Sequence, residues 1–182
     1  MDVGANSGLF GAAVFDRWPL AQVHSFEPQR QLIAVIREFA EINGLAGQSR
    51  VNWCAVSDQN GETELFQNRN PISASMIREK VARRTIKRIS KVPMLTLDEY
   101  ARGQGLARVD LLKVDVEGAE MEVLRGAKKM LSETKLLFLE VHPPFSTLNA
   151  ATELLKESGL VHRHASRLFA NDQSNCAFVR RA

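Results

Sequence analysis

The stretch Asp2-Val-Gly-Ala-Asn-Ser-Gly8 decides the fold, because it reads as the end of a strand, a glycine-rich turn and the start of a helix. In doubly wound α/β sheets, ligands bind at the carboxyl ends of the parallel strands, where the strand order reverses. Glycines in such a turn let the backbone approach a ligand without a clash from Cβ. We therefore expect a ligand site there, built from Asp2, Gly4, Ala5, Asn6 and Gly8.

This turn departs from the dinucleotide fingerprint G-x-G-x-x-G, in which a helix N-terminus receives a pyrophosphate. Here the acidic residue Asp2 precedes the first glycine. An acid in that place suits a ligand with a cationic amino group, such as the α-ammonium of methionine, better than a phosphate. An NAD-dependent oxidoreductase is therefore disfavoured, and an ordinary glycine-rich turn without a ligand is the remaining alternative.

Outward from this turn, short apolar runs alternate with amphipathic stretches, which predicts βα units and a mostly parallel, doubly wound sheet of seven strands. The expected strands are Met1–Val3, Gln22–Phe26, Val51–Val56, Val109–Val114, Leu136–Val141, Val161–His164 and Ala177–Arg180, of which the last two can be antiparallel. The expected helices are Leu9–Arg17, Gln31–Ile42, Leu97–Ala101, Ala119–Leu131 and Thr152–Ser158. Residues 60–95 break the alternation, with short strands at Thr63–Phe66 and Val92–Leu95, and we interpret them as an inserted flap.

The bulk properties are those of one globular domain over residues 1–182, with 45% hydrophobic and 25% charged residues. No apolar run approaches the roughly 20 residues that span a bilayer. The start has no basic region followed by an apolar one, so we expect no secretory signal. Cys54 and Cys176 lie in apolar runs, which predicts buried thiols in a reducing cytoplasm rather than a disulfide or a metal site.

The net charge of +3 is concentrated in one segment, residues 78–91, so the rest of the chain is net negative. Its basic residues are Arg78, Lys80, Arg83, Arg84, Lys87, Arg88 and Lys91, and its one acidic residue is Glu79. A solvated face is the simplest interpretation, and recognition of an anionic acceptor or surface is the functional one. Few aromatic residues interleave with these charges, which disfavours single-stranded nucleic acid, and a nucleic-acid partner is not expected.

Polar residues end the second and third predicted strands. A carboxylate at Glu27 can accept hydrogen bonds from both hydroxyls of a ribose, and Pro28 ends the strand and starts a helix. After the third strand, the backbone of Ala55 and Val56 or the side chain of Asp58 can contact an adenine amine. A plain turn is the alternative at Asp58, because Asp-Gln-Asn-Gly is a favourable turn sequence.

Lys113, Asp115 and Glu117 alternate at the end of a strongly apolar strand, so a continued strand places them on one side. Charges clustered there are costly unless they are paired or used. We expect them to bind substrate, accept a proton or orient an acceptor hydroxyl, with Asp115 also beside the ligand of the glycine turn. A structural network of lysine and carboxylates is the alternative.

Glu140 and His142 end the next strand. Histidine is suited near neutral pH to take the proton of an acceptor hydroxyl as that hydroxyl attacks, and a structural polar pair is the alternative. No spacing of Cys, His and Asp indicates a structural zinc site, so we assign no metal ligand. A divalent ion at the carboxylates Asp115, Glu117 and Glu140 is the alternative.

Together these segments resemble the FkbM family of methyltransferases, class I enzymes that use S-adenosylmethionine. The matching segments are DVGANSG at Asp2–Gly8, FEP at Phe26–Pro28, AVSD at Ala55–Asp58, Ser73-Ala-Ser75, TLDEY at Thr96–Tyr100, LLKVDVEGAEMEVLRGA at Leu111–Ala127 and LEVH at Leu139–His142. The glycine turn is shared with many methyltransferases, whereas KVDVEGAE preceded by TLDEY is more specific.

The resemblance implies a Rossmann-like methyltransferase fold, S-adenosylmethionine as cofactor and S-adenosylhomocysteine as product. The residues that it assigns to the cofactor are Asp2, Gly4, Asn6 and Glu27, and those on the catalytic or acceptor side are Lys113, Asp115, Glu117 and Glu140. Members similar to this chain methylate hydroxyls of sugars or small metabolites. The family usually has a fuller first strand than Met1–Val3, so a truncated or non-catalytic cofactor-binding domain is the alternative function, and a nucleic-acid methyltransferase is a weaker one.

Overall fold

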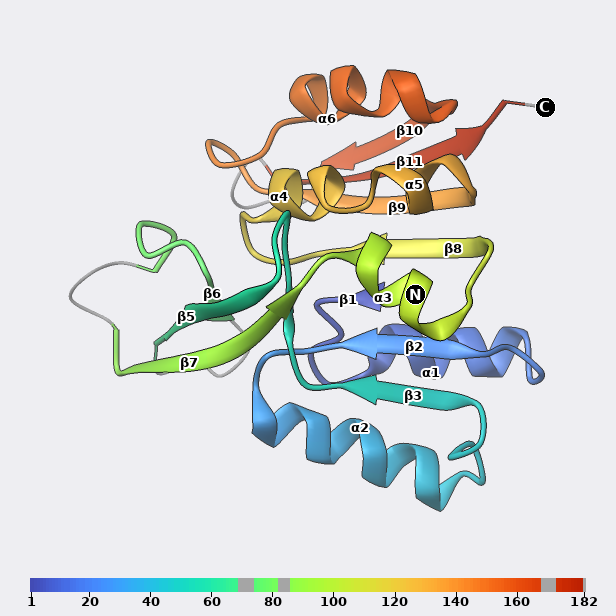
Figure 1. The fold of residues 1–182 in the computed structure, drawn as a ribbon, viewed down its shortest axis with the longest axis vertical. Helices are drawn as coiled ribbons and strands as arrows, with labels where there is room; N and C mark the ends of the chain where they lie inside the picture. Colours follow the sequence, from blue (N-terminus) through green and yellow to red (C-terminus); the bar gives the residue numbers. More distant parts are fainter. Residues whose placement is uncertain (69–73, 82–85, 168–172, 182) are drawn as a thin grey trace.

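The computed structural model describes residues 1–68, 74–81, 86–167 and 173–181. Its main sheet has seven strands in the order β10-β11-β9-β8-β1-β2-β3 (Figure 1). They are β1 (Asp2–Val3), β2 (Val23–Phe26), β3 (Ser49–Asn52), β8 (Val109–Val114), β9 (Thr134–Val141), β10 (Leu160–Arg167) and β11 (Ser174–Arg180). The neighbours from β9 to β3 pair in parallel, and β11 runs antiparallel between β9 and β10. The predicted mostly parallel seven-stranded sheet, its short first strand and its antiparallel last pair are confirmed.

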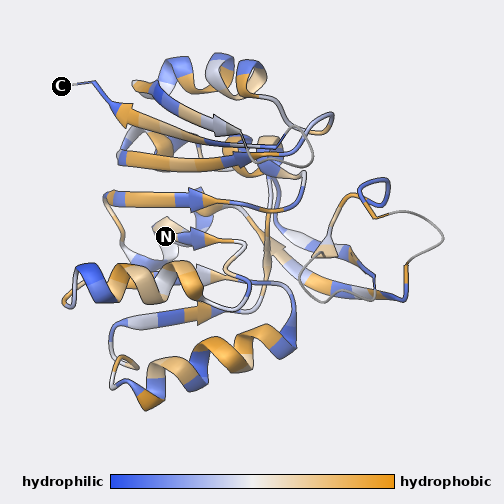
Figure 2. Cartoon of the chain, turned by 180° about the vertical axis from the view of Figure 1, so that it is seen from behind, coloured by the Kyte–Doolittle hydropathy of each residue, from blue (hydrophilic) through white to orange (hydrophobic). Residues whose placement is uncertain are grey.

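Helices flank both faces of this sheet, as a doubly wound fold requires. They are α1 (Leu9–Arg17), α2 (Arg30–Ile42), α3 (Leu97–Gln104), α4 (Glu120–Arg125), α5 (Lys128–Ser132), α6 (Leu148–Leu155) and the 3₁₀ turn Lys156–Ser158. Figures 1 and 2 show α1 on one face and α3 with α5 on the other. Threonine caps start two of the helices, because the hydroxyls of Thr96 and Thr147 accept backbone N–H groups three residues on. None of the helices in the described ranges is long and apolar enough to cross a membrane.

The single helix predicted over Ala119–Leu131 is wrong, because the chain forms α4 and α5 with a break at Gly126. A Cβ on Gly126 would lie 2.0 Å from the carbonyl oxygen of Ser57, so the backbone is pressed against another segment there. The carboxylate of Asp98 then accepts the N–H groups of Lys129 and Met130, at 3.0 and 2.8 Å, and caps the new helix. The break is therefore a tertiary contact rather than a local preference.

The predicted third strand Val51–Val56 is also divided. β3 ends at Asn52, and after two intervening residues β4 (Ala55–Val56) begins in a second sheet of order β4-β7-β5-β6. The chain changes sheet because β4 pairs with β7 through Ala55 with Met94 and Val56 with Leu95. The second sheet also contains β5 (Gly61–Gln67), β6 (Ala74–Ser75) and β7 (Arg88–Leu95).

This second sheet is the flap expected over residues 60–95, enlarged by β4. It extends beyond the carboxyl ends of the parallel strands (Figure 1), so it covers the edge where ligands bind. Ser73 of the family segment and Arg83 and Arg84 of the basic run lie outside the described residues.

The core between the main sheet and the helices holds the carboxyl ends of β8 and β9 in place. Leu112, Val114, Leu137 and Leu139 are fully buried in these two strands, and apolar residues run along them in Figure 2. Cys54 and Cys176 are buried free thiols, as the sequence predicted. A rigid strand pair of this kind fixes the side chains that follow it.

Candidate active site

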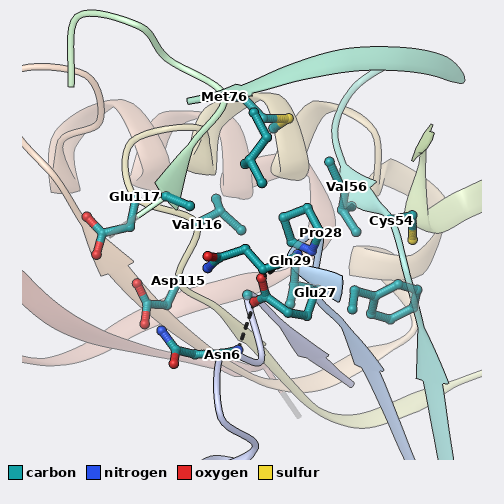
Figure 3. Close-up of a pocket in the computed structure, with 16 residues that line it drawn as sticks. Asn6, Glu27, Pro28, Gln29, Cys54, Val56, Met76, Asp115, Val116 and Glu117 are labelled. Atoms are coloured by element: carbon teal, nitrogen blue, oxygen red, sulfur yellow. Dashed lines mark hydrogen bonds between the residues drawn. The ribbon is translucent and has the colours of Figure 1, made fainter. Parts of the chain in front are cut away.

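A cleft lies at the carboxyl ends of β1, β2 and β8, against the second sheet (Figure 3). The predicted site residues that line it are Gly4, Asn6, Glu27, Pro28, Ala55, Val56, Asp115 and Glu117. Its other lining residues, to which the sequence assigned no role, include Gln29, Cys54, Leu65, Met76 and Val116. The predicted residues Asp2, Ala5, Gly8 and Asp58 are not among the lining residues. The glycine turn and the second strand end thus meet in one cleft, as their places in the sequence indicated.

The glycine turn is set by close packing against β8. Gly4 has a φ of 73°, and a Cβ on it would lie 1.8 Å from the carbonyl oxygen of Asp115. The N–H groups of Gly4 and Ala5 both donate to the carbonyl oxygen of Phe26, at 3.0 Å. Ala5 is buried beneath the turn. Only glycine fits at position 4, because any Cβ there would clash with Asp115.

Glu27 is the central polar group of the cleft. Its side chain is buried, Oε2 accepts the N–H of Asn6 and Oε1 accepts the N–H of Gln29, both at 2.9 Å (Figure 3). Burial raises the pKa of Glu27, and the two backbone donors oppose that rise. Each carboxylate oxygen has two acceptor positions, and the Gln29 side chain also hydrogen-bonds this carboxylate, so part of its acceptor capacity remains for a ligand hydroxyl.

The wall opposite Glu27 is apolar. Val56 lies in β4, Met76 follows β6 and Val116 follows β8, and the three gather on one side of the cleft in Figure 3. Burial raises the pKa of the Cys54 thiol beside them to about 12, so this thiol stays neutral at physiological pH. A wall of this kind can hold a flat, weakly polar ring.

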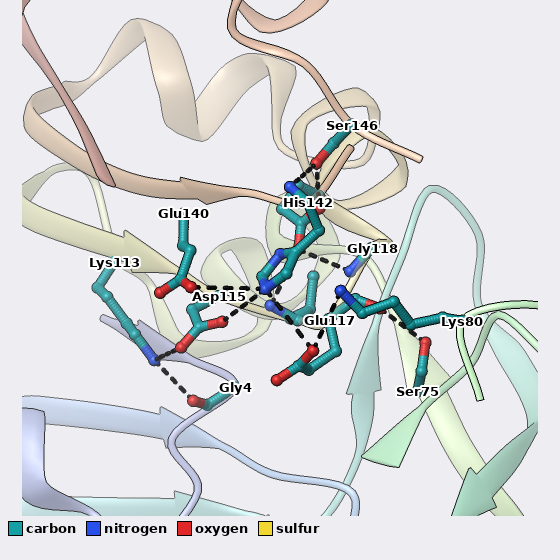
Figure 4. Close-up of polar contacts among 12 residues, drawn as sticks. Gly4, Ser75, Lys80, Lys113, Asp115, Glu117, Gly118, Glu140, His142 and Ser146 are labelled. Carbon is teal, nitrogen blue, oxygen red and sulfur yellow. Dashed lines mark hydrogen bonds and ion pairs between the residues drawn. The ribbon is translucent and has the colours of Figure 1, made fainter. Parts of the chain in front are cut away.

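The charged residues predicted at the ends of β8 and β9 converge beside this cleft (Figure 4). Lys113 is turned toward the glycine turn: its Nζ donates to the carbonyl oxygen of Gly4 at 2.7 Å. The same Nζ lies 3.3 Å from Asp2 Oδ1 and 3.5 Å from Asp115 Oδ2. Lys113 therefore links β1 to β8, and Asp2 lies under the turn as its buried ion-pair partner.

His142 lies at the centre of the charged residues and is 1% exposed. Its Nδ1 is 2.9 Å from Glu120 Oε1. Its Nε2 faces Glu117 Oε2 and Glu140 Oε1, each at 3.6 Å, and Asp115 Oδ1 at 4.0 Å. Burial by itself lowers the pKa of His142, but the hydrogen bond and charge of Glu120 outweigh burial and the pKa is raised.

Glu120 is the functional candidate that the sequence analysis missed, although the family segment contains it. It is 0% exposed at the start of α4, and it accepts hydrogen bonds from Gly118 N at 2.9 Å and from the Ser146 hydroxyl. Burial works to raise the pKa of Glu120, but the hydrogen bond from His142 prevails and the pKa is lowered. An acid directly before the apolar residues of an amphipathic helix was the available signal, because a buried charge requires a partner.

Two further features complete this region. Burial and the charge of Asp115 raise the pKa of Glu140. Glu117 has a φ of 54°, in the left-handed region that a residue with a side chain rarely adopts. The flap is fastened to the same residue, because Ser75 Oγ donates to the carbonyl oxygen of Glu117 at 2.8 Å and Lys80 Nζ lies 3.4 Å from Glu117 Oε2 (Figure 4).

Comparison with known proteins gives consistent matches. The family described as the methyltransferase FkbM domain matches residues 2–165. Methyltransferase sdnD of Sordaria araneosa is 27% identical over 208 residues, covering 100% of this chain and 80% of sdnD. The 31-O-demethyl-FK506 methyltransferase FkbM of Streptomyces tacrolimicus is 27% identical over 208 residues, covering 99% of this chain and 79% of that protein.

Among solved structures, methyltransferase FkbM from Methylobacillus flagellatus KT superposes with a TM-score of 0.68 at 15% sequence identity. The superposition covers 98% of this chain, which spans 42% of that structure's chain. At this identity the match concerns the fold.

Proposed function

The chain belongs to the FkbM family of methyltransferases, and on that premise we propose that it transfers a methyl group from S-adenosylmethionine to a hydroxyl of a sugar or another small metabolite. The proposal rests on one observation: the cleft and the group of charged residues adjoin each other. The cleft around Glu27 and the charged residues around His142 share Asp115 and Glu117. A methyl donor and a hydroxyl acceptor must meet at such a junction.

The residues present fit the cofactor. Glu27 is buried and lines the cleft with acceptor capacity left for a ribose hydroxyl, and Val56, Met76 and Val116 offer an apolar wall to adenine. Asp115, beside the close approach of Gly4, suits the methionine part. When bound, the cofactor supplies a methyl group on a positively charged sulfur, and the carboxylates on this side favour that charge.

The charged residues suit activation of the acceptor. In the neutral form of His142, Nδ1–H donates to Glu120, which leaves the lone pair on Nε2 and fixes the ring orientation. Nε2 then serves as the base that takes the hydroxyl proton, and the imidazolium that forms is stabilised by Glu117 and Glu140 at 3.6 Å. An acceptor bound beside Nε2 of His142 would present its oxygen toward Asp115 and the cleft.

The first test is calorimetric titration of the chain with S-adenosylhomocysteine, with ATP as the control nucleotide. We expect saturable binding of S-adenosylhomocysteine and much weaker binding of ATP. Absence of binding even at millimolar S-adenosylhomocysteine would overturn the proposal.

The second test is an acceptor screen with radiolabelled methyl donor across glycosides and nucleotide sugars. We expect transfer to at least one hydroxylated acceptor and none to its O-methylated form. Tight binding of S-adenosylhomocysteine without transfer to any acceptor would instead favour the non-catalytic alternative.

A further inference from the structure

Three ligand atoms of different residues converge at the ends of β8 and β9. Asp115, Glu140 and His142 each direct one such atom into the same space, and these atoms lie within 4.8 Å of one another. Two ligands at about 2.1 Å from one ion are at most about 4.2 Å apart. The Nε2 atom of His142 already meets that limit, at 3.6 Å from Glu140 Oε1 and 4.0 Å from Asp115 Oδ1.

The orientation of His142 distinguishes this arrangement from a simple cluster of acids. The ring is 1% exposed, and its Nδ1 is held by the fully buried Glu120. Within the described part of the chain, Nε2 makes no hydrogen bond and points at the carboxylates. An imidazole that is fixed through one nitrogen by a carboxylate, while its other nitrogen faces candidate ligand atoms, has the support typical of metal-binding histidines.

The local charges also favour a cation. Lys113 pairs with Asp115 at 3.5 Å and Lys80 pairs with Glu117 at 3.4 Å. For Glu140, His142 is the one ion-pair partner among the described residues, and the neighbouring acids repel its charge. A divalent ion at this point would compensate the excess negative charge.

We propose that Asp115, Glu140 and His142 bind a divalent first-row transition-metal ion that also holds the acceptor hydroxyl. One imidazole nitrogen and two carboxylate oxygens suit Mn²⁺, Co²⁺ or Zn²⁺ better than Ca²⁺ or Mg²⁺, which prefer oxygen ligands alone. Three protein ligands leave coordination positions open for the acceptor. The acceptor part of this inference rests on the proposed function, whereas the binding of the ion does not.

In the metal-bound form the ion takes the lone pair of Nε2, so His142 is a ligand there rather than the base. The ion lowers the pKa of the acceptor hydroxyl, as divalent metals do for bound water. The hydroxyl proton passes to Glu117, which lies 3.6 Å from Nε2. The acceptor oxygen forms its bond to the methyl carbon, and the carbon–sulfur bond breaks with its electron pair left on sulfur.

The experiment is a titration with Co²⁺ of the full chain, stripped with EDTA and dialysed, in the presence of S-adenosylhomocysteine. Visible absorption reports cobalt coordination, and Mn²⁺ is added as a competitor. We expect one equivalent to bind, with at least about tenfold weaker affinity in His142→Gln and in Glu140→Gln. The matched control is Glu122→Gln, which changes an exposed carboxylate of α4 that pairs with Arg125 and should leave cobalt affinity unchanged.

Circular dichroism and S-adenosylhomocysteine affinity are measured for each variant, and Glu140→Gln replaces a partly exposed side chain if His142→Gln fails to fold. Equal cobalt binding in all variants, or no saturation by about 1 mM Co²⁺, would overturn the metal site. If S-adenosylhomocysteine still binds in that case, the methyltransferase proposal stands. If cobalt binds at these residues but S-adenosylhomocysteine does not, the proposed function fails and the metal site remains.

Discussion

At the β1–β2 side of the cleft the polar contacts are made with the backbone, whereas at the β8–β9 side charged side chains face one another. Glu27 receives two N–H groups in a tightly packed turn. His142 instead points its Nε2 at carboxylates 3.6 Å away, beyond hydrogen-bond distance. The first side is therefore limited by space and the second by charge, so substitutions should damage them in different ways.

The largest effect is expected where space is smallest, at Gly4→Ala. The new Cβ would lie 1.8 Å from Asp115 O on a backbone with a φ of 73°, so the turn or β8 must move. We expect the free energy of unfolding to fall by at least about 3 kcal/mol, measured by urea denaturation. The control is Gly103→Ala in α3, where nothing lies within 4 Å of the new Cβ and a gain of up to about 1 kcal/mol is expected. Equal stability of Gly4→Ala and the parent chain would refute the steric account.

The charged side should lose function together with stability at Glu120→Gln. This change leaves His142 buried without its anionic partner, and we expect a loss of about 3 kcal/mol in the free energy of unfolding. The kcat for methyl transfer should fall by about 100-fold or more, because the ring loses its fixed orientation. Glu122→Gln on the same helix should change stability by less than about 0.5 kcal/mol. If both variants behave alike, Glu120 has no positioning role.

The interaction between Glu120 and His142 should depend on pH when it is measured in the presence of EDTA. The pKa of His142 is raised, so its contribution to stability is full below its unfolded value of 6.5 and is lost as the pH rises through the folded pKa. The pKa of Glu120 is lowered, so its contribution is present above 4.5 and is lost as the pH falls through the folded pKa. A double-mutant cycle with Glu120→Gln and His142→Gln should give a coupling energy of about 1–3 kcal/mol that is largest between pH 4.5 and 6.5. A coupling energy independent of pH would contradict the charged pair.

The smallest expected effect is on cofactor affinity at Glu27→Gln. The amide keeps the size of the side chain but loses the charge and one acceptor, so we expect S-adenosylhomocysteine to bind about tenfold more weakly in calorimetry. Asp58→Asn is the matched control, because Asp58 is exposed and does not line the cleft. A larger loss at position 58 than at position 27 would move the nucleoside to the β4 end of the cleft.

The sequence predicted the features that depend on local order along the chain. The carboxyl ends of parallel strands meet at one edge of a sheet, so residues such as Glu27 and Asp115 could be assigned to the same edge from their strands alone. The break at Gly126 could not be predicted, because helical periodicity continues through it and the cause is contact with Ser57, far away in the chain. The departure of β4 from the main sheet likewise depends on its pairing with Met94 and Leu95.

The same distinction explains the candidate site. Lys113 and Asp115 alternate within one strand, and their proximity follows from strand geometry. The contact between Glu120 and His142 joins the start of α4 to the end of β9, and it exists only once both pack on the sheet. No pattern within either segment contains it, although the burial of a charged residue indicated that some partner was required.

The left-handed backbone of Glu117 affects which residue selection would favour at this position. A residue with a side chain at a φ of 54° costs about 1–2 kcal/mol, which glycine would recover. Glycine would also remove the carboxylate that lies 3.6 Å from Nε2 of His142 and pairs with Lys80. Laboratory selection for heat resistance alone should therefore drift toward glycine at position 117, and selection for turnover should retain glutamate. Thermal stability and turnover therefore favour different residues at position 117.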